Sequence, residues 1–197
     1  MSANPKDSAM QWVVNETTML QDCRVFTVDK ISCTRALSPS SLAPSTALTS
    51  AAVDGGDARQ FSSINPAELP DQSHDFFVMN CPDFVNVVAL TSDGLCVLVE
   101  QWRHGSQELT LEIPGGLVDA GESAETAARR ELLEETGFEA AEWIKIGVCR
   151  PNAAIQSNHC TTILALDARL VAAPSFDAHE HCVVHTLPWP EVVARVR

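Results

Sequence analysis

The sequence predicts an α+β or mixed α/β domain in which a sheet packs with one well-defined helix. Short apolar runs with strand character recur on both sides of a single segment. Only that segment combines helical spacing with capping signals at both ends. A chain of 197 residues with 45% apolar residues is large enough to bury a substantial core.

The chain divides into three parts by composition. Residues 1–37 form an N-terminal extension in which Arg24–Asp29 alternates as a strand does. Residues 38–75 are rich in Ser, Ala, Pro, Asp and Gly, which predicts a flexible insertion. Residues 76–197 hold most of the periodic segments and are predicted to form the main domain.

The main domain is predicted to alternate strands with turns around its helix. Ser92-Asp93-Gly94 is typical of a hairpin turn, and Pro190 is suited to open a short terminal helix over residues 191–196. The predicted strands cover residues 76–79, 85–90, 95–100, 109–113, 143–148, 161–166 and 182–187.

The central helix is predicted over residues 124–136. Ser123 is a suitable N-cap, and Gly137 suits the left-handed position just after a helix. Before it, Ile113 is followed by Pro114, Gly115 and Gly116, a tight turn whose backbone can approach another group closely.

Three glutamates of this helix, Glu131, Glu134 and Glu135, follow i, i+3, i+4 spacing and so share one face. A solvated acidic face is the ordinary interpretation of such a run. However, Ala124, Ala127 and Ala128 fall on the same face, and small residues indicate close packing. Like charges resist close packing, and a hard divalent cation such as Mg²⁺ would relieve the conflict.

The segment also carries a specific spacing. A glycine is followed after five residues by a glutamate and after seven more by Arg-Glu and an apolar residue; after one further residue come Glu-Glu, any residue, a glycine and an apolar residue. It resembles the signature of the Nudix hydrolases, and each position of that signature is present in this sequence. The resemblance implies a Nudix-type α/β/α sandwich, with a mixed sheet between helices and one catalytic helix. The matching residues are Gly116, Glu122, Arg130, Glu131, Leu132, Glu134, Glu135, Gly137 and Phe138.

The resemblance also implies roles for these residues. Glu131, Glu134 and Glu135 would bind Mg²⁺, or Mn²⁺ in its place, together with a backbone carbonyl of Gly115 or Gly116. Glu134 and Glu135 would also act in catalysis. The resemblance places Glu122 and Arg130 around the glutamates as supports rather than as ligands.

A general base is expected on a loop after the helix, as in relatives that split nucleoside diphosphate sugars. In the loop at residues 177–181, Glu180 is the candidate. Its neighbours His179 and His181 could complete a metal trio, but exposed loop histidines are the commoner interpretation.

Residues 100–103 resemble the Gln-aromatic-Arg element of the ADP-ribose pyrophosphatase branch. Arg103 would contact a phosphate bidentately, through two N–H groups. Trp102 would either stack on a base or cover part of the hydrophobic core. Glu112 occupies the position of a residue that often binds a ribose or a metal-bound water in that branch. A solvated residue of a strand is the alternative interpretation. Pro151 lies 13 residues beyond Phe138, which departs from the usual spacing of this branch.

The expected reaction is hydrolysis of a diphosphate linkage, with ADP-ribose yielding AMP and ribose 5-phosphate as the leading case. Other nucleotide sugars, dinucleoside polyphosphates and nucleoside triphosphates are alternative substrates, since specificity lies on loops. A nucleotide-sensing module without turnover is the alternative of another class. The family also suggests a homodimer in which residues 12–36 exchange between protomers.

Composition limits the partners and the compartment. A formal charge of −13 disfavours binding to nucleic acid or to an anionic membrane. The seven cysteines lack C-x-x-C spacing, and most lie in apolar runs, such as Cys96 and Cys149, where buried reduced thiols are expected. No export signal or long apolar stretch is present, so a cytoplasmic protein is predicted.

Overall fold

The computed structural model describes residues 12–35, 73–176 and 181–195. Nearly all of the predicted insertion at 38–75 lies outside this range, as do His179 and Glu180. The described residues divide into two compact units, one holding Val28–Val78 and the strand before Cys23, the other holding Cys23–Thr27 and the chain from Met79 onward.

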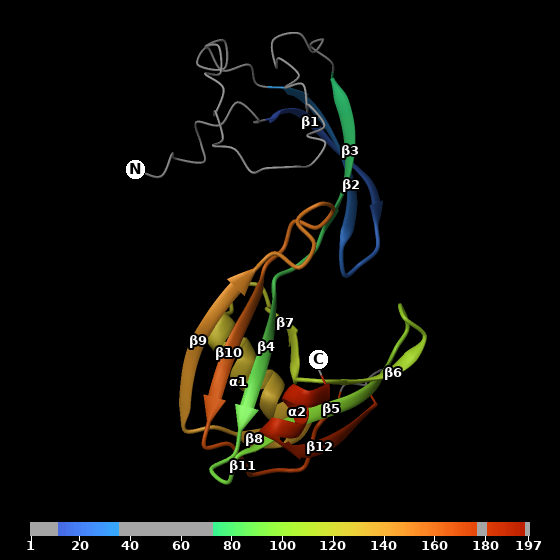
Figure 1. Cartoon of the computed structure of the whole chain (residues 1–197). Coiled ribbons are helices and arrows are strands. Elements are labelled where there is room, and N and C mark those ends of the chain that lie inside the picture. The colour runs from blue at the N-terminus through green and yellow to red at the C-terminus, as the bar shows by residue number, and fades with distance from the viewer. Residues whose placement is uncertain (1–11, 36–72, 177–180, 196–197) are drawn as a thin grey trace, which may run out of the picture. The chain divides into compact units, whose positions relative to one another are not determined.

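The first unit is a three-stranded sheet with the order β1-β2-β3 (Figure 1). Its strands are β1 (Trp12–Asp22), β2 (Thr27–Arg35) and β3 (His74–Asn80). The Trp12 ring meets the Phe76 ring edge-on, with 5.3 Å between the centroids. Lys30 pairs with Asp75 across 3.3 Å, so β2 and β3 also interact through their side chains.

The predicted strand Arg24–Asp29 is wrong at its start. Cys23 to Phe26 form a turn in which the Cys23 N–H donates to the Phe26 carbonyl at 2.9 Å, and the strand begins at Thr27. Arg24 has a left-handed φ of 69°. The chain reverses direction here, and a short alternating pattern does not distinguish a strand from a turn followed by a strand.

In the second unit, the described residues form a seven-stranded sheet with the central order β12-β5-β4-β10-β9. β6 pairs with β5 and β7 pairs with β4, while β10 and β4 run parallel, so the sheet is mixed. A separate two-stranded ribbon joins β8 (Phe138–Glu139) and β11 (Arg169–Leu170). The sheet strands are β4 (Phe84–Leu90), β5 (Leu95–Arg103), β6 (Glu108–Glu112), β7 (Gly115–Leu117), β9 (Glu142–Cys149), β10 (Cys160–Leu166) and β12 (Cys182–Pro188).

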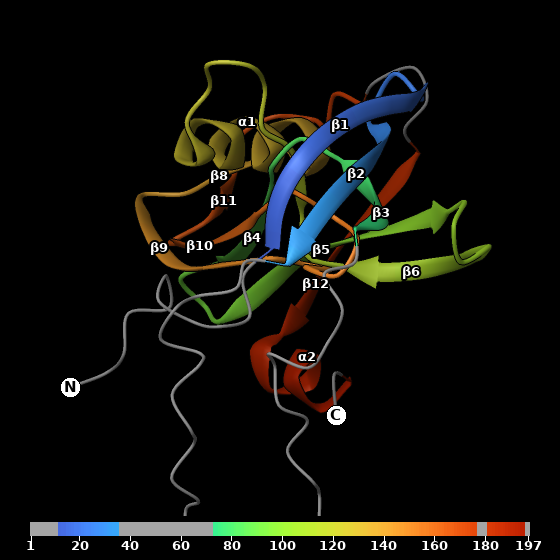
Figure 2. The same cartoon turned by 90° about the horizontal axis from the view of Figure 1, so that it is seen from above.

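Two helices, α1 (Ala124–Thr136) and α2 (Trp189–Arg195), lie on opposite sides of this sheet (Figure 2). Strand β5 explains the layering, because its side chains alternate. Val97 joins the core beneath α1, whereas Cys96 and Leu98 join a second cluster with Val192 of α2. The fold is therefore α+β with a mixed sheet between helices, which confirms the predicted class.

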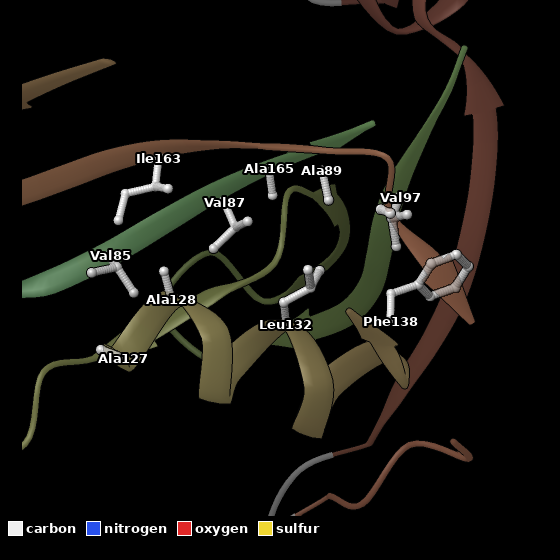
Figure 3. Packing of buried hydrophobic residues seen from close by; sticks show 11 residues of the cluster. Val85, Val87, Ala89, Val97, Ala127, Ala128, Leu132, Phe138, Ile163 and Ala165 are labelled. Atoms are coloured by element: carbon white, nitrogen blue, oxygen red, sulfur yellow. The ribbon is translucent and has the colours of Figure 1, made fainter. Parts of the chain in front are cut away.

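The core beneath α1 is built from small and branched side chains (Figure 3). Ala127, Ala128 and Leu132 of α1 are fully buried against the strands, so the small face of the helix does pack closely. The remaining members of this cluster are Val85, Val87, Ala89, Val97, Phe138, Ile163, Ala165 and Ala168.

The sheet opens at one end. β4 and β5 are paired at Ala89 with Val97 and at Leu90 with Cys96. Further along, β4 pairs instead with β7, and β5 pairs with β6. The two halves diverge in Figure 1, and the side chains between them line the cavity described below.

The predicted helix at residues 124–136 and the seven predicted strands are confirmed as elements, but the strand at 76–79 is part of β3 and belongs to the three-stranded sheet of the first unit. One cysteine expectation is wrong: Cys96 is buried, but Cys149 is exposed because it is the last residue of β9, which lies at the edge of the sheet. In the part of the chain that the structure describes, no helix is long and apolar enough to cross a membrane.

Candidate active site

A cavity of about 660 Å³ lies where the two halves of the sheet separate, beside α1. Its lining comes from both halves and from the helix, so segments far apart in the sequence meet here. The lining residues are Phe84, Asn86, Gln101, Arg103, Glu112, Ile113, Gly115, Gly116, Leu117, Asp119, Arg130, Glu131 and Glu135.

Helix α1 is fixed at both ends by its own sequence. The Ser123 hydroxyl accepts a hydrogen bond from the Thr126 N–H at 3.1 Å, and so satisfies an amide that the helix leaves free. Gly137 adopts a φ of 74° and donates to the Leu133 carbonyl at 2.8 Å. A Cβ there would also collide with the Ala172 carbonyl, so the position requires glycine.

The turn at Gly115 and Gly116 brings the backbone against two of the predicted ligands. The Gly115 N–H donates to Glu135 Oε2 at 2.9 Å, and this carboxylate belongs to a residue that is 5% exposed. A Cβ on Gly116 would lie 2.6 Å from Glu131 Oε2 and closer still to Oε1. Only glycine therefore leaves room for the Glu131 carboxylate beside the β7 backbone.

Arg130 connects the acidic residues of this region. Its guanidinium binds both carboxylate oxygens of Glu122, at 3.2 and 3.0 Å, and donates to the Leu117 carbonyl at 3.0 Å. The same group reaches Glu131 at 2.7 Å and Glu134 at 3.2 Å. The prediction that Glu122 and Arg130 support the glutamates agrees with this geometry, although their role in a working site stays a prediction.

These contacts shift the acid–base equilibria in the expected directions. The hydrogen bonds from Arg130 hold the pKa of Glu122 below its ordinary value, with help from the Asp119 N–H. In return, the bonds to Glu122 and then Glu131 raise the pKa of Arg130. The guanidinium therefore remains charged while it neutralises the acidic cluster.

Arg103 of β5 reaches Glu112 of β6 through its side chain, although the strand register pairs Arg103 with Glu108 and Glu112 with Val99. The Arg103 Nε and Nη2 atoms donate to the two Glu112 carboxylate oxygens at 2.8 and 2.6 Å. This two-point contact lowers the pKa of Glu112. Both side chains remain partly exposed, at 47% and 30%, so the guanidinium is accessible from the cavity that it lines.

Some predicted site residues lie apart from this group. Trp102 is 50% exposed and does not line the cavity, since neighbouring residues of a strand point to opposite faces. The Glu134 side chain is 48% exposed and also lies outside the lining. Glu180 is outside the described residues, so its assignment as general base stays a prediction.

Sequence reasoning assigned no site role to six lining residues: Phe84, Asn86, Gln101, Ile113, Leu117 and Asp119. Asn86 offered one signal, because it is the single polar residue in the apolar strand Phe84–Leu90. The others could not be found without knowing that β4 and β5 separate. Their contribution depends on tertiary geometry rather than on a local pattern.

The residues present fit a hard divalent cation. The donors that line the cavity beside the glycine turn are oxygens, from Glu131, Glu135 and the Gly115–Gly116 backbone, and Mg²⁺ and Mn²⁺ prefer oxygen ligands. Gly116 leaves the Glu131 carboxylate directly against the backbone of β7. Among the described residues the carboxylates are not gathered around one point, because Arg130 and the Gly115 N–H already bind them.

Two curated relatives are similar to part of the chain. A methanol dehydrogenase activator of Bacillus methanolicus is 33% identical over 113 residues, which cover 56% of this chain and 61% of that protein. An ADP-ribose pyrophosphatase of Bacillus subtilis is 36% identical over 84 residues, covering 42% and 45%. The chain thus spans about half the length of the curated relatives that it matches.

The fold agrees with a solved structure. The crystal structure of an ADP compounds hydrolase superposes with a TM-score of 0.69 at 19% identity, over 96% of this chain and 84% of that one. At this identity the likeness shows the fold alone. The model of the NUDIX domain matches residues 82–190, which is more than half of the chain and includes the whole capped helix and glycine turn. This chain belongs to the Nudix family.

Proposed function

We propose that the chain is a Mg²⁺-dependent pyrophosphohydrolase that cleaves the diphosphate linkage of a nucleoside diphosphate sugar. The leading substrate is ADP-ribose, which would give AMP and ribose 5-phosphate. One observation carries the proposal: carboxylates of α1, the Gly115–Gly116 backbone and the Arg103 guanidinium converge on one cavity. Relatives named for ADP-ribose and for ADP compounds support the choice of an adenosine diphosphate ester.

The acidic helix would hold the cation. Glu131, Glu134 and Glu135 would bind it with a carbonyl of Gly115 or Gly116, displacing Arg130 from the first two carboxylates. When bound, divalent ions neutralise a diphosphate and lower the pKa of an attacking water. Arg130 would remain attached to Glu122 and the Leu117 carbonyl, which keeps it beside the helix.

Arg103 would hold the substrate. Its planar guanidinium already makes a two-point contact with the Glu112 carboxylate, and a phosphate offers two oxygens in the same geometry. Glu112 keeps the guanidinium oriented until a phosphate competes for it. Trp102 as a base-stacking residue and Glu180 as general base belong to this proposal as predictions from sequence.

The compartment and assembly also remain predictions. We expect a cytoplasmic homodimer with a small-molecule nucleotide as partner and without binding to nucleic acid or membrane. Size-exclusion chromatography with light scattering should give a dimer mass for the full chain and a smaller assembly after removal of residues 1–36. An unchanged assembly would contradict strand exchange.

The function is tested by product analysis. The full chain with Mg²⁺ is incubated with ADP-ribose, GDP-mannose, diadenosine polyphosphates and dATP, and the products are separated by chromatography. We expect AMP and ribose 5-phosphate from ADP-ribose. The Glu131→Gln variant should lose at least about 100-fold in kcat, the order expected when an electrostatic group of a site is removed.

Glu125→Gln is the matched control. Glu125 lies on the same helix, but its side chain is more than half exposed and pairs with Arg129, one turn later. This variant should hydrolyse ADP-ribose at the parent rate. Cleavage of another substrate instead would correct the specificity, while nucleotide binding without turnover on every substrate would favour the sensing module.

A further inference from the structure

Two cysteines outside the cavity face each other directly across the sheet. Cys149 is the last residue of β9 and Cys160 is the first of β10, and the antiparallel register pairs one with the other. Both are free thiols, and besides burial the neighbouring Cys149 side chain adds to the causes that raise the pKa of the Cys160 thiol. Directly opposed Cα atoms in antiparallel strands lie about 4.5 or 5.5 Å apart, and a disulfide accepts both separations.

The two thiols differ in accessibility. Cys149 lies on the edge strand and is exposed, whereas Cys160 lies one strand further in and is 3% exposed. Burial raises the pKa of the Cys160 thiol. A reagent in solution therefore meets Cys149 first, while Cys160 is protected from attack but stands next to the Cys149 sulfur.

The pair also encloses a defined segment. Residues 150–159 form the loop between β9 and β10, so Cys149 and Cys160 sit at its two ends. The loop is tied to the chain that enters β4. The Ile155 carbonyl accepts from Met79 at 2.7 Å, and the His159 N–H donates to Asp83 Oδ1 at 2.7 Å. Next along the chain is Phe84, which lines the cavity.

We infer that Cys149 and Cys160 form a reversible disulfide that closes the 150–159 loop in response to a low-molecular-weight disulfide. The Cys149 thiolate attacks one sulfur of the reagent, which forms a mixed disulfide and releases one thiol. Cys160 then loses its proton and attacks the Cys149 sulfur, which forms the internal disulfide and releases the second thiol. Two protein thiols are oxidised and one reagent disulfide is reduced, so electrons and atoms balance.

The other cysteines serve as internal comparisons. Cys23 is exposed, but the strand register that pairs Cys149 with Cys160 does not include it. Glutathione that attaches to Cys23 should therefore remain there as a mixed disulfide. Cys96 is fully buried, and burial raises the pKa of its thiol to about 11, so it should not react in the folded chain.

The test uses the full chain with oxidised glutathione as the probe, followed by alkylation of free thiols and tryptic peptide mapping. The bond between Arg150 and Pro151 resists trypsin, so one peptide, residues 146–169, carries both cysteines. We expect this peptide to carry no alkyl group and to have two hydrogens fewer than the reduced, unalkylated peptide, and to gain both alkyl groups when reduction precedes alkylation. Cys160→Ser should instead trap glutathione on Cys149, and Cys149→Ser should leave Cys160 in the thiol form.

Three results would overturn the inference. Retention of both alkyl groups under conditions that glutathionylate Cys23 would mean that Cys149 does not react. A mixed disulfide that persists on Cys149 of the parent chain would mean that Cys160 cannot reach it. A disulfide from Cys149 to any other cysteine would assign the reactive pair differently. The experiment does not depend on turnover, so it stands whether or not the proposed function does.

Discussion

Replacing Gly116 by alanine should lower kcat by about 100-fold while the chain remains folded. The added Cβ would lie 2.6 Å from Glu131 Oε2, whereas an ordinary carbon–oxygen contact is about 3.5 Å. The Glu131 carboxylate, the end of a flexible side chain, must therefore move by roughly 1 Å. A displacement of this size at a reacting centre costs on the order of 100-fold in rate, or about 2.7 kcal/mol in the activation free energy.

The assay compares kcat for ADP-ribose hydrolysis with the thermal unfolding midpoint of the same preparations. Gly147→Ala is the matched control, because a Cβ at Gly147 on β9 meets nothing within 4 Å. It should leave kcat unchanged. A Gly116→Ala variant that keeps kcat within a few-fold of the parent would refute the reasoning, because Glu131 would then not need its present position.

Gly115→Ala should behave differently from its neighbour. There the Cβ would collide with the backbone carbonyl of Val85 and lie 3.0 Å from Asn86 Oδ1. Backbone cannot move aside as a side chain can, so this variant should lower the unfolding midpoint as well as kcat. Comparison of the two alanine variants would thus distinguish a loss of kcat that comes from the site alone from a loss that comes with lower stability of the fold.

Three further predictions concern stability. Leu132→Ala should lower the free energy of unfolding by about 2–5 kcal/mol in urea titrations, because the Leu132 side chain of α1 is fully buried in the core between the helix and the sheet. Ser123→Ala should cost about 1 kcal/mol, since the Thr126 N–H loses its acceptor, and a Ser123→Asp variant should restore most of it. Because Arg103 lowers the pKa of Glu112 from its ordinary 4.5, this pair stabilises the fold above about pH 4.5, and the contribution is lost as the pH falls through the folded pKa. Arg103→Met should make unfolding less dependent on pH on this acid side, and an unaltered pH profile would contradict the assignment.

The sequence was most informative where local chemistry decides the structure. Ser123 and Gly137 bracket α1 at the observed bounds, because each residue type is selected by one backbone geometry. The alternating strands of the main domain were equally readable, because one or both faces are buried. The match to a family pattern then assigned the carboxylates before any geometry was known.

Features that depend on contacts between distant segments could not be predicted. The alternation around Arg24 did not reveal a turn, and nothing local indicates that β4 and β5 separate to open a cavity. Helical spacing placed Glu134 on the face of its two neighbours, yet its side chain remains largely exposed. Around the helix axis Glu134 lies about 60° from Glu131 and about 100° from Glu135, and the position of the sheet decides which of these carboxylates is covered.

The position of Arg130 has a consequence for how the protein matures. Three carboxylates on one helical turn would ordinarily repel one another in the absence of an ion, but Arg130 already bridges two of them and anchors to Glu122. Arg130 therefore acts as the counter-ion of Glu131 and Glu134 within the chain itself. Under the proposed function, folding would then not require the metal, in contrast to small zinc domains that fold only when loaded. The cation supply would govern the activity of the protein rather than its stability.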